Sequence, residues 1–199
     1  MTSLLILLLM HATILVNMAH LVCVRVNWNN TAPSIPIPGA FHMLNIIPTV
    51  EYPFGEKGKT LAGAWKQLDH DNTMDGMLIL DGDVAIEPVD LANMFAAIHG
   101  HDKMVVVAPA RIWPTSTKRK EWSWAHWTKQ PSQVMETENV RWFSFNFTYL
   151  PKKVIEQALN DGLRTWMYPR VDKRVADSAF KAGVPVYVAQ NVSTKHLHF

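Results

Sequence analysis

A run of apolar residues that stops abruptly at two carboxylates constrains this chain more than any other feature. Residues 76–88 read GMLILDGDVAIEP, so a run of large apolar side chains leads directly into Asp81 and Asp83. The apolar run favours a strand buried inside a sheet. Two unpaired ions at the end of such a strand are costly to remove from water, so they need a partner. Carboxylate oxygens suit Mg²⁺ or Mn²⁺, which commonly keep open positions for the phosphate oxygens of a substrate.

Apolar periodicity and turn residues predict that strands and helices alternate along the rest of the chain. Expected strands lie at 3–10, 41–50, 77–80, 104–108, 142–150 and 184–189, expected helices lie at 60–68, 89–98, 151–160 and 171–182, and residues 13–24 form a helix or a further strand. This alternation predicts an α/β fold with a mostly parallel central sheet flanked by helices. In such sheets, ligands bind at the carboxyl ends of strands, which is where Asp81 and Asp83 fall. The length of 199 residues and the hydrophobic content of 48% fit a single domain over 1–199.

Charge is distributed unevenly along the chain, although the net charge is only +2. Seven acids and no Lys or Arg lie between Asp69 and Asp90, whereas six bases and two acids lie between Asp102 and Lys129. An acidic edge beside a basic, aromatic segment suits a site that binds a metal and an anionic ligand together. Cys23 is the only cysteine, so the chain has no disulfide framework, and a reducing, cytoplasmic compartment is expected.

The N-terminal segment permits two interpretations. Residues 4–10 are wholly apolar, and the first Lys, Arg, Asp or Glu is Arg25. The chain begins Met-Thr-Ser, without the basic residues that open a secretory signal. A membrane span needs about 20 apolar residues, and His11, Asn17 and His20 interrupt this segment. We therefore expect a buried strand over 3–10 and no stable membrane insertion, with a signal anchor as the alternative.

The familiar nucleotide-binding motifs are missing from the sequence, which contains neither G-x-G-x-x-G nor a P-loop, so a dinucleotide oxidoreductase or a P-loop NTPase is disfavoured. Residues 79–88, ILDGDVAIEP, instead resemble the strand and Asp-x-Asp motif of GT-A glycosyltransferases. Members of this family use nucleotide-sugar donors and hold Mn²⁺ or Mg²⁺ between the motif and the donor diphosphate. Many of them also carry an acid about eleven residues before a Gly, then a strand, then a His near the metal. Asp172 precedes Gly183 by eleven residues, and His196 and His198 follow the next expected strand.

The resemblance extends over residues 50–199 and implies a fold. That fold is GT-A-like, the Rossmann-like fold of nucleotide-diphospho-sugar transferases, with a donor-binding half at 1–100 and an acceptor-binding half at 101–199. In size, the chain is similar to small glycosyltransferases of the kind encoded by phages. A phage-encoded enzyme of this kind is expected in the host cytoplasm.

The chemistry of sugar transfer assigns the acidic pair to a metal. A departing nucleoside diphosphate carries charge that a cation can neutralise, so Asp81 and Asp83 are predicted metal ligands, with Asp81 also reaching the ribose or a metal-bound water. Gly82 allows the backbone to approach the nucleotide closely. A neutral imidazole is the candidate third ligand, and the spacing does not choose between His196 and His198.

Deprotonation of the acceptor hydroxyl needs a carboxylate within hydrogen-bond range, and Asp172 is the candidate base. Each of these assignments has a structural alternative. Asp172 could cap a helix that starts at Lys173, and residues 81–83 could simply form a turn between a strand and a helix. Histidines this close to the C-terminus could be disordered.

Further contacts follow from the resemblance and from a helix start after Gly58. Donor contacts are expected at the polar turn after the first strand and at the helix start, where amide groups favour phosphate. The candidate donor contacts are His11, Thr13 and the two lysines that flank Gly58, Lys57 and Lys59. Acceptor specificity is expected in the aromatic second half of the chain, because indole faces stack on sugars. The candidate acceptor contacts are Trp142, Phe143 and Trp166.

These features together predict a metal-dependent hexosyltransferase. It is expected to move a sugar from a UDP- or GDP-linked donor to a hydroxyl of a protein, DNA, glycan or lipid acceptor, with inversion slightly favoured by the candidate base. A sugar-nucleotide pyrophosphorylase is one alternative. Another is a non-catalytic nucleic-acid-binding module that uses the basic segment with Trp113, Trp122, Trp124 and Trp127. Such a module should bind in EDTA and weaken steeply with salt.

Overall fold

The structure is a computed structural model, and it describes part of the chain. The described residues are 21–26, 45–47, 56–69, 72, 74–81, 84–109, 111–112, 123–124, 134–135, 143–167 and 170–196. For residues 21–26, 45–47, 68, 111–112, 123–124, 134–135 and 196, the description concerns the backbone alone.

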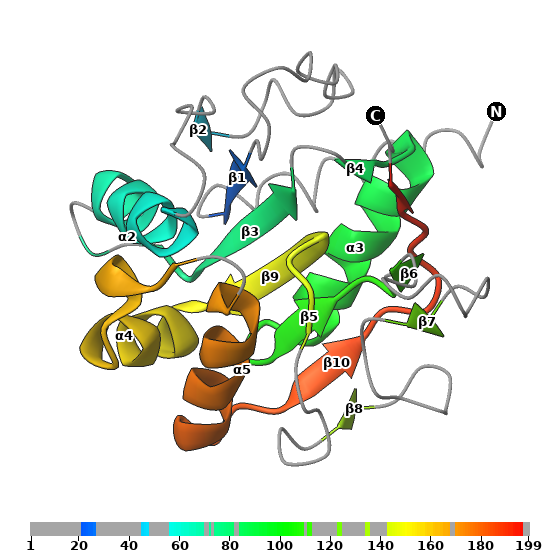
Figure 1. The fold of residues 1–199 in the computed structure, drawn as a ribbon. Coiled ribbons are helices and arrows are strands. Elements are labelled where there is room, and N and C mark those ends of the chain that lie inside the picture. Colours follow the sequence, from blue (N-terminus) through cyan, green and yellow to red (C-terminus); the bar gives the residue numbers. More distant parts are fainter. Residues whose placement is uncertain are drawn as a thin grey trace, which may run out of the picture.

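The described ranges contain both helices and strands (Figure 1). The helices are α2 (Lys57–Leu68), α3 (Pro88–Gly100), α4 (Lys152–Asn160) and α5 (Val171–Lys181), with a 3-10 turn η3 (Leu163–Thr165). The strands are β1 (Leu21–Val26), β2 (Asn45–Ile47), β3 (Gly76–Asp81), β4 (Val84–Ala85), β5 (Val105–Val107), β6 (Arg111–Ile112), β7 (Ser123–Trp124), β8 (Val134–Met135), β9 (Phe147–Pro151), β10 (Val186–Val188) and β11 (Lys195–His196). Among the helices in these ranges, none is long and apolar enough to cross a membrane.

The main sheet is mixed, so the prediction of an α/β fold is confirmed and the prediction of a mostly parallel sheet was wrong. Its order is β2-β1-β3-β9-β5-β10-β8. Strand β1 pairs in parallel with β2 and β3, and β10 pairs in parallel with β5. Strand β9 runs antiparallel to both β3 and β5, and β8 runs antiparallel to β10. Every residue of β9 is buried, as in a parallel strand, so its apolar pattern carries no information about direction.

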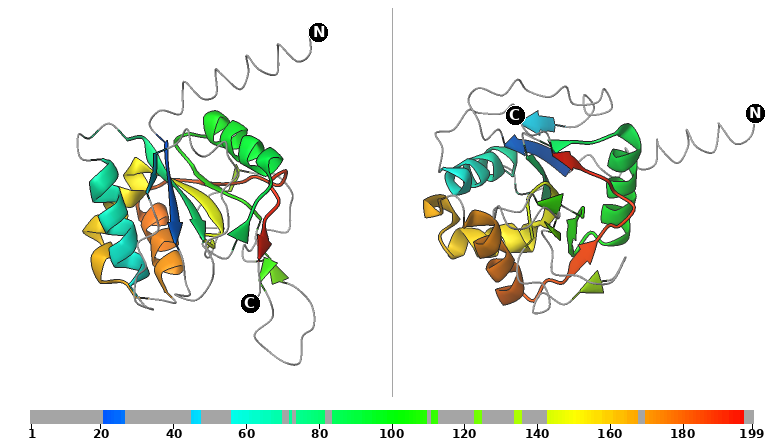
Figure 2. Two further views of the ribbon diagram at one scale, coloured as in Figure 1. Left: turned by 90° about the horizontal axis from the view of Figure 1, so that it is seen from above. Right: turned by 45° about the vertical axis from the view of Figure 1, so that its right-hand side comes forward.

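Helices cover both faces of this sheet (Figure 2), with α2, α4 and α5 on one face and α3 on the other. Alternate residues of β3 divide between the two layers, because successive side chains of a strand point to opposite faces. Met77 and Ile79 pack with the α2, α4 and α5 layer, and Leu78 and Leu80 pack with the α3 layer. By the same alternation, Asp81 faces the layer that contains α2 and α5.

Several predicted elements are confirmed, with boundaries shifted by a few residues. Helix α3 begins at Pro88, behind a capping box in which Glu87 and Asp90 bond each other's backbone amides. Gly183 follows the end of α5 with φ 62°, a conformation that favours glycine. The expected strand at 142–150 begins only at Phe147. The expected strand at 3–10 lies outside the described residues.

Helices α4 and α5 are joined by a carboxylate, which provides a test by pH. Fully buried Ser178 donates to Asp161 Oδ2 at 2.7 Å, and Lys181 Nζ lies 3.0 Å from Asp161 Oδ1. The hydrogen bond from Ser178 is the main reason that the pKa of Asp161 is lowered from its ordinary value of 3.8. A lowered folded-state pKa contributes stability above the unfolded-state value, and this contribution is lost as pH falls through the folded-state value.

We expect Ser178→Ala to lower the free energy of unfolding by about 1.5–3 kcal/mol at pH 7, the usual contribution of a hydrogen bond to a charged group. The difference between parent and variant should shrink as pH falls from 3.8 through the lower pKa of the folded state, because Asp161 is protonated first in the unfolded state and then in the folded state. Urea unfolding at a series of pH values measures this. A difference that stays constant down to low pH would show that the carboxylate does not depend on Ser178.

Candidate active site

Asp81 lies where the chain reverses its direction of travel across the sheet. From β1 the chain moves to β2 on one side, and β3 then adds to β1 on the other side. Strands β1 and β3 are parallel, with Val26 opposite Asp81, so both end at the same edge. In open α/β sheets, ligands bind at the carboxyl ends of strands at such a switch point. The prediction that Asp81 falls at the carboxyl end of a buried strand is therefore confirmed.

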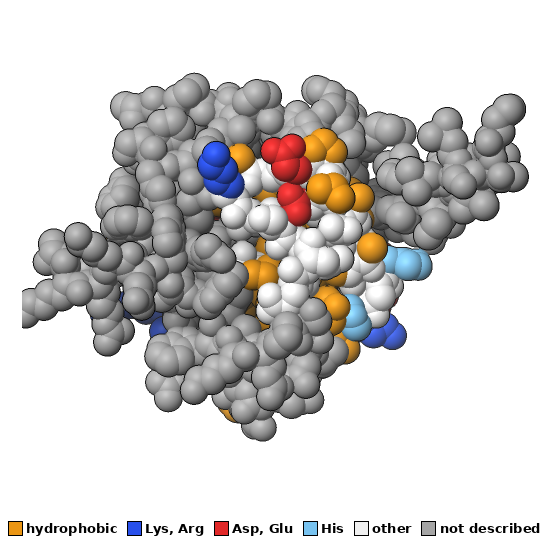
Figure 3. Space-filling view, turned by 90° about the vertical axis from the view of Figure 1, so that its right-hand side faces the viewer, with side chains coloured by type: hydrophobic (Ala, Val, Ile, Leu, Met, Phe, Trp, Pro, Cys, Tyr) orange, Lys and Arg blue, Asp and Glu red, His pale blue; other side chains and the backbone are white. Residues whose placement is uncertain are grey.

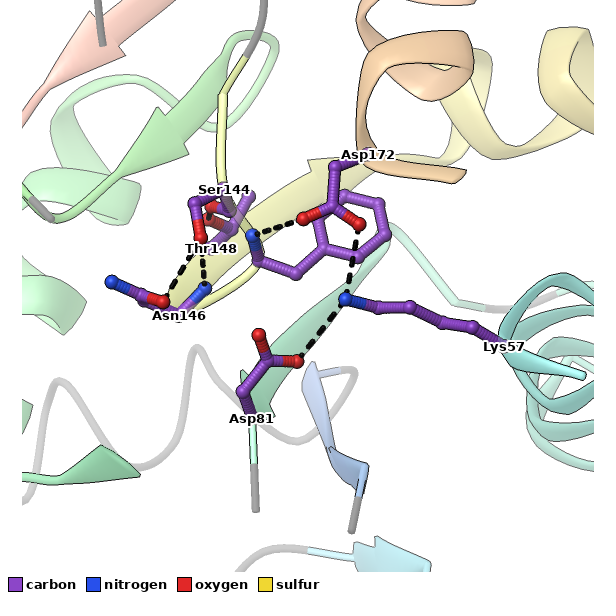
Figure 4. Close-up of polar contacts among 7 residues, drawn as sticks. Lys57, Asp81, Ser144, Asn146, Thr148 and Asp172 are labelled. Carbon is purple, nitrogen blue, oxygen red and sulfur yellow. Dashed lines mark hydrogen bonds and ion pairs between the residues drawn. The ribbon is translucent and has the colours of Figure 1, made fainter. Parts of the chain in front are cut away.

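A buried lysine joins the two acids that the sequence singled out (Figure 4). Lys57 Nζ lies 3.4 Å from Asp81 Oδ1 and 3.0 Å from Asp172 Oδ1. The side chains of Lys57 and Asp81 are 3% and 8% exposed, and that of Asp172 is 19% exposed. Asp172 is therefore the most open member of this cluster, which we call the Asp81–Lys57–Asp172 triad. Its three charges sum to −1.

Asp172 is held from a second side by the segment before β9. The backbone N–H of Phe145 donates to Asp172 Oδ2 at 3.3 Å, while Oδ1 faces Lys57. Helix α5 begins at Val171, so Asp172 lies within its first turn, where a negative charge is favoured by the helix dipole. The alternative that Asp172 caps a helix starting at Lys173 was wrong, because its carboxylate instead bonds groups of α2 and of the segment before β9.

Lys57 is the first residue of α2, an unfavourable place for a cation because the positive end of the helix dipole is there. Its ammonium also lies over the ring of Phe145, 4.6 Å from the centroid. The two carboxylates and this ring offset the cost of burying the charge. Local preferences are most often violated at functional sites, so this position is informative.

The start of α2 is fixed by Gly58. The N–H of Gly58 donates to the carbonyl of Trp166 at 3.2 Å. A Cβ at this position would collide with the carbonyl oxygen of Leu163 and would lie 2.6 Å from that of Trp166. Glycine thus permits α2 to approach the 163–166 segment closely, and this approach sets the position of Lys57. Because its amide already bonds Trp166, Gly58 does not offer that amide to a phosphate here.

Sequence reasoning missed a buried polar row beside the triad. Ser144 Oγ donates to Asn146 Oδ1 at 2.9 Å, and Thr148 Oγ1 donates to the carbonyl of Ser144 at 2.8 Å. All three side chains are buried, and the carbonyl of Asn146 accepts the N–H of Asp81 at 3.1 Å. The signal was the alternation of Phe with Ser, Asn and Thr over residues 143–148, since small polar residues buried within an apolar strand need partners.

The C-terminal segment approaches the acidic motif through its backbone. Strand β11 pairs antiparallel with β4, and His196 is opposite Val84, the residue that follows Asp83. Asp90 at the start of α3 holds the approach to β11, because its Oδ1 accepts the N–H of Ser193 at 2.7 Å. Figure 3 views the right-hand side of Figure 1, and on the described surface there a few acidic side chains lie close together, with hydrophobic side chains beside them.

The remaining predicted site residues are not brought together by the described structure. Lys59 is 65% exposed and pairs with Glu56 at 3.1 Å. Phe143 is fully buried in the core, and Trp166 is 5% exposed. Six further candidates, namely His11, Thr13, Gly82, Asp83, Trp142 and His198, lie outside the described residues. The donor, metal and acceptor roles of all these residues stay predictions.

Among the described side chains, no group of three His, Cys, Asp or Glu could hold a metal ion. Asp81 is the one predicted ligand whose side chain is described. Its place fits a metal ligand, since its carboxylate ends a buried strand next to β4 and belongs to a triad whose formal charges sum to −1. Carboxylate oxygens are also the ligands that Mg²⁺ and Mn²⁺ prefer.

Comparison with known proteins gives a fold and no family. No protein-family model and no curated protein matches the chain. Among solved structures, the crystal structure of A197 from STIV is similar, with a TM-score of 0.53 and 13% sequence identity. The match covers 89% of this chain and 86% of that chain. At this identity, the similarity concerns the fold alone.

Proposed function

We propose that this protein is a metal-dependent glycosyltransferase of the GT-A type, which moves a sugar from a nucleotide diphosphate to a hydroxyl acceptor. The observation that carries the proposal is the meeting of Asp81 and Asp172. These acids come from opposite halves of the sequence, yet they share one ammonium at the switch point of the sheet. The Asp-x-Asp resemblance assigns the first acid to the donor and the second to the acceptor, so a transferase needs both at one site.

Asp172 suits the role of general base because of its accessibility. Its side chain is 19% exposed, whereas Lys57 is 3% exposed. An acceptor hydroxyl can therefore reach the carboxylate from solvent without entering the buried part of the triad. Bonds from Phe145 and Lys57 come from two other elements, and they orient the carboxylate. A base held at a fixed angle within hydrogen-bond range is what deprotonation of a hydroxyl requires.

In the proposed reaction, the acceptor oxygen forms a bond to the anomeric carbon of the sugar. The bond from that carbon to the diphosphate oxygen of the donor breaks, and the hydroxyl proton passes to Asp172. Attack by the acceptor from the face opposite the leaving group would invert the anomeric configuration. A carboxylate that activates the acceptor directly supports inversion over retention.

The cation would be held by Asp81 and Asp83, with an imidazole of the C-terminal segment as a further ligand. When bound, a divalent cation neutralises negative charge on a departing diphosphate. Support for the imidazole is the pairing of β11 with β4, which aligns the backbone of His196 with the residue after Asp83. We propose UDP or GDP as the nucleotide part of the donor, and Mn²⁺ or Mg²⁺ as the ion.

A panel of nucleotide sugars tests this function. Hydrolysis or transfer should appear with one UDP- or GDP-linked sugar in the presence of Mn²⁺ or Mg²⁺, and should stop in EDTA. Asp81→Asn should lose most of this activity, because a carboxylate at the donor side is removed. Asp75→Asn is the matched control, since Asp75 is exposed just before the same strand. Equal activity in EDTA, or in Asp81→Asn and the parent, would contradict the proposal.

A further inference from the structure

We propose that Lys57 is the resident cation of this site, which keeps the divalent ion out of the space between Asp81 and Asp172. The inference rests on the proposed function, because it concerns where the metal of the transferase can bind. In this account, Lys57 separates two carboxylates that would otherwise chelate one ion. Asp81 then acts as a ligand of the metal, and Asp172 is not a metal ligand.

The geometry supports this separation. The ammonium of Lys57 lies 3.4 Å from an oxygen of Asp81 and 3.0 Å from an oxygen of Asp172. A divalent ion at the position of this ammonium would contact the same two oxygens, and a divalent ion close beside the ammonium would be repelled strongly where little water screens the charges. The close-up shows the lysine reaching between the carboxylates from α2 (Figure 4).

Fold stability alone does not explain a lysine here. It is the first residue of α2, where the helix dipole disfavours a positive charge. Buried ion pairs and triads can often be replaced by apolar residues without loss of stability. Lys59, two residues later, has the environment that is usual for a lysine, since its side chain is 65% exposed and pairs with Glu56 within the same turn. A role for the charge of Lys57 in the site accounts for its burial.

For the proposed reaction, this arrangement would keep the divalent cation away from Asp172, the proposed base. A carboxylate bound to a divalent ion is a poor proton acceptor, because the ion stabilises its charged form. An ammonium in the same place, with a single charge, orients Asp172 by an ion pair to Oδ1, while Oδ2 of Asp172 accepts the N–H of Phe145. Lys57 is therefore a positioning residue, which acts on the base without touching the reacting atoms.

Metal binding by Lys57→Met tests the inference directly. Titration with Mn²⁺, followed by electron paramagnetic resonance, should show an additional Mn²⁺ or an affinity raised by roughly tenfold or more. The double variant Lys57→Met with Asp172→Asn should lose this gain, because one of the two carboxylates is then missing. Lys66→Met is the matched control, since Lys66 is exposed in the last turn of the same helix, and it should bind Mn²⁺ as the parent does. A Lys57→Met protein that binds no more Mn²⁺ than the parent would overturn the inference.

A second measurement does not depend on the folding of Lys57→Met. In the protein with Lys57 present, Asp172→Asn should leave Mn²⁺ affinity unchanged, whereas Asp81→Asn should lower it. Loss of Mn²⁺ affinity in Asp172→Asn would place that acid among the ligands and overturn the inference, while metal-dependent transfer by the parent would still uphold the proposed function. Conversely, a parent without Mn²⁺ affinity, together with a gain in Lys57→Met, would uphold the inference and count against the proposed function.

Discussion

Asp172→Asn is expected to lower the rate of sugar transfer by about 10²–10⁴-fold, the usual contribution of a general base. The amide keeps an oxygen that can accept the N–H of Phe145, but it cannot take a proton from the acceptor. Donor binding in the presence of Mn²⁺ should persist, since the donor side of the site retains Asp81. Transfer rates and donor affinity, measured separately, distinguish the loss of the base from the loss of the site.

Asp177→Asn is the matched control for this change. Asp177 lies on the same helix, but its side chain is 51% exposed and pairs with Lys173 at 3.0 Å. An exposed pair one helical turn apart contributes little, so activity and stability should stay close to those of the parent. If Asp172→Asn retained full transfer, or if both variants lost transfer alike, Asp172 would not be the base.

Gly58→Ala is expected to lower the free energy of unfolding by about 3 kcal/mol or more, the upper range for forcing atoms into a packed region. The added methyl group would meet two backbone carbonyls, those of Leu163 and Trp166, which cannot rotate away as a side chain can. Helix α2 must then move away from the 163–166 segment and take Lys57 with it. Transfer should therefore fall even in protein that remains folded.

Gly100→Ala provides the control, because a Cβ at the end of α3 would meet nothing within 4 Å. This substitution should be neutral or stabilise by up to about 1 kcal/mol, since alanine is the better helix former. Thermal and urea unfolding of both variants measure the difference. Equal stability of Gly58→Ala and the parent would show that the contact between α2 and Trp166 is looser than described.

Much of the described fold could be predicted because its elements have clear local signals. Such signals indicate the structure of only a few neighbouring residues. Examples are the apolar run that forms a strand before Asp81, Pro88 at a helix start and Gly183 after a helix end. The direction of β9 could not be predicted, because burial on both faces looks the same in parallel and antiparallel strands.

The candidate site likewise contains residues that the sequence could predict and contacts that it could not. Asp81 and Asp172 could be singled out from their motifs, and the structure brings them together through a residue that the motifs do not contain. Sequence reasoning named both lysines at the start of α2 as candidate donor contacts and did not distinguish them. In the structure Lys57 is buried between the two acids, whereas Lys59 is exposed. Which lysine is buried depends on how α2 packs against Trp166, and that contact joins segments far apart in the chain.

The most direct test of the account is a calorimetric titration of UDP and GDP into the parent protein. With Mn²⁺ present, one of the two nucleotides should bind, and Asp81→Asn should bind it more weakly. With EDTA in place of Mn²⁺, binding should disappear, because in the proposed function the cation would link the acidic pair to the diphosphate. Binding of equal strength in EDTA, or binding of neither nucleotide with Mn²⁺, would contradict the claim that Asp81 marks a metal-dependent donor site.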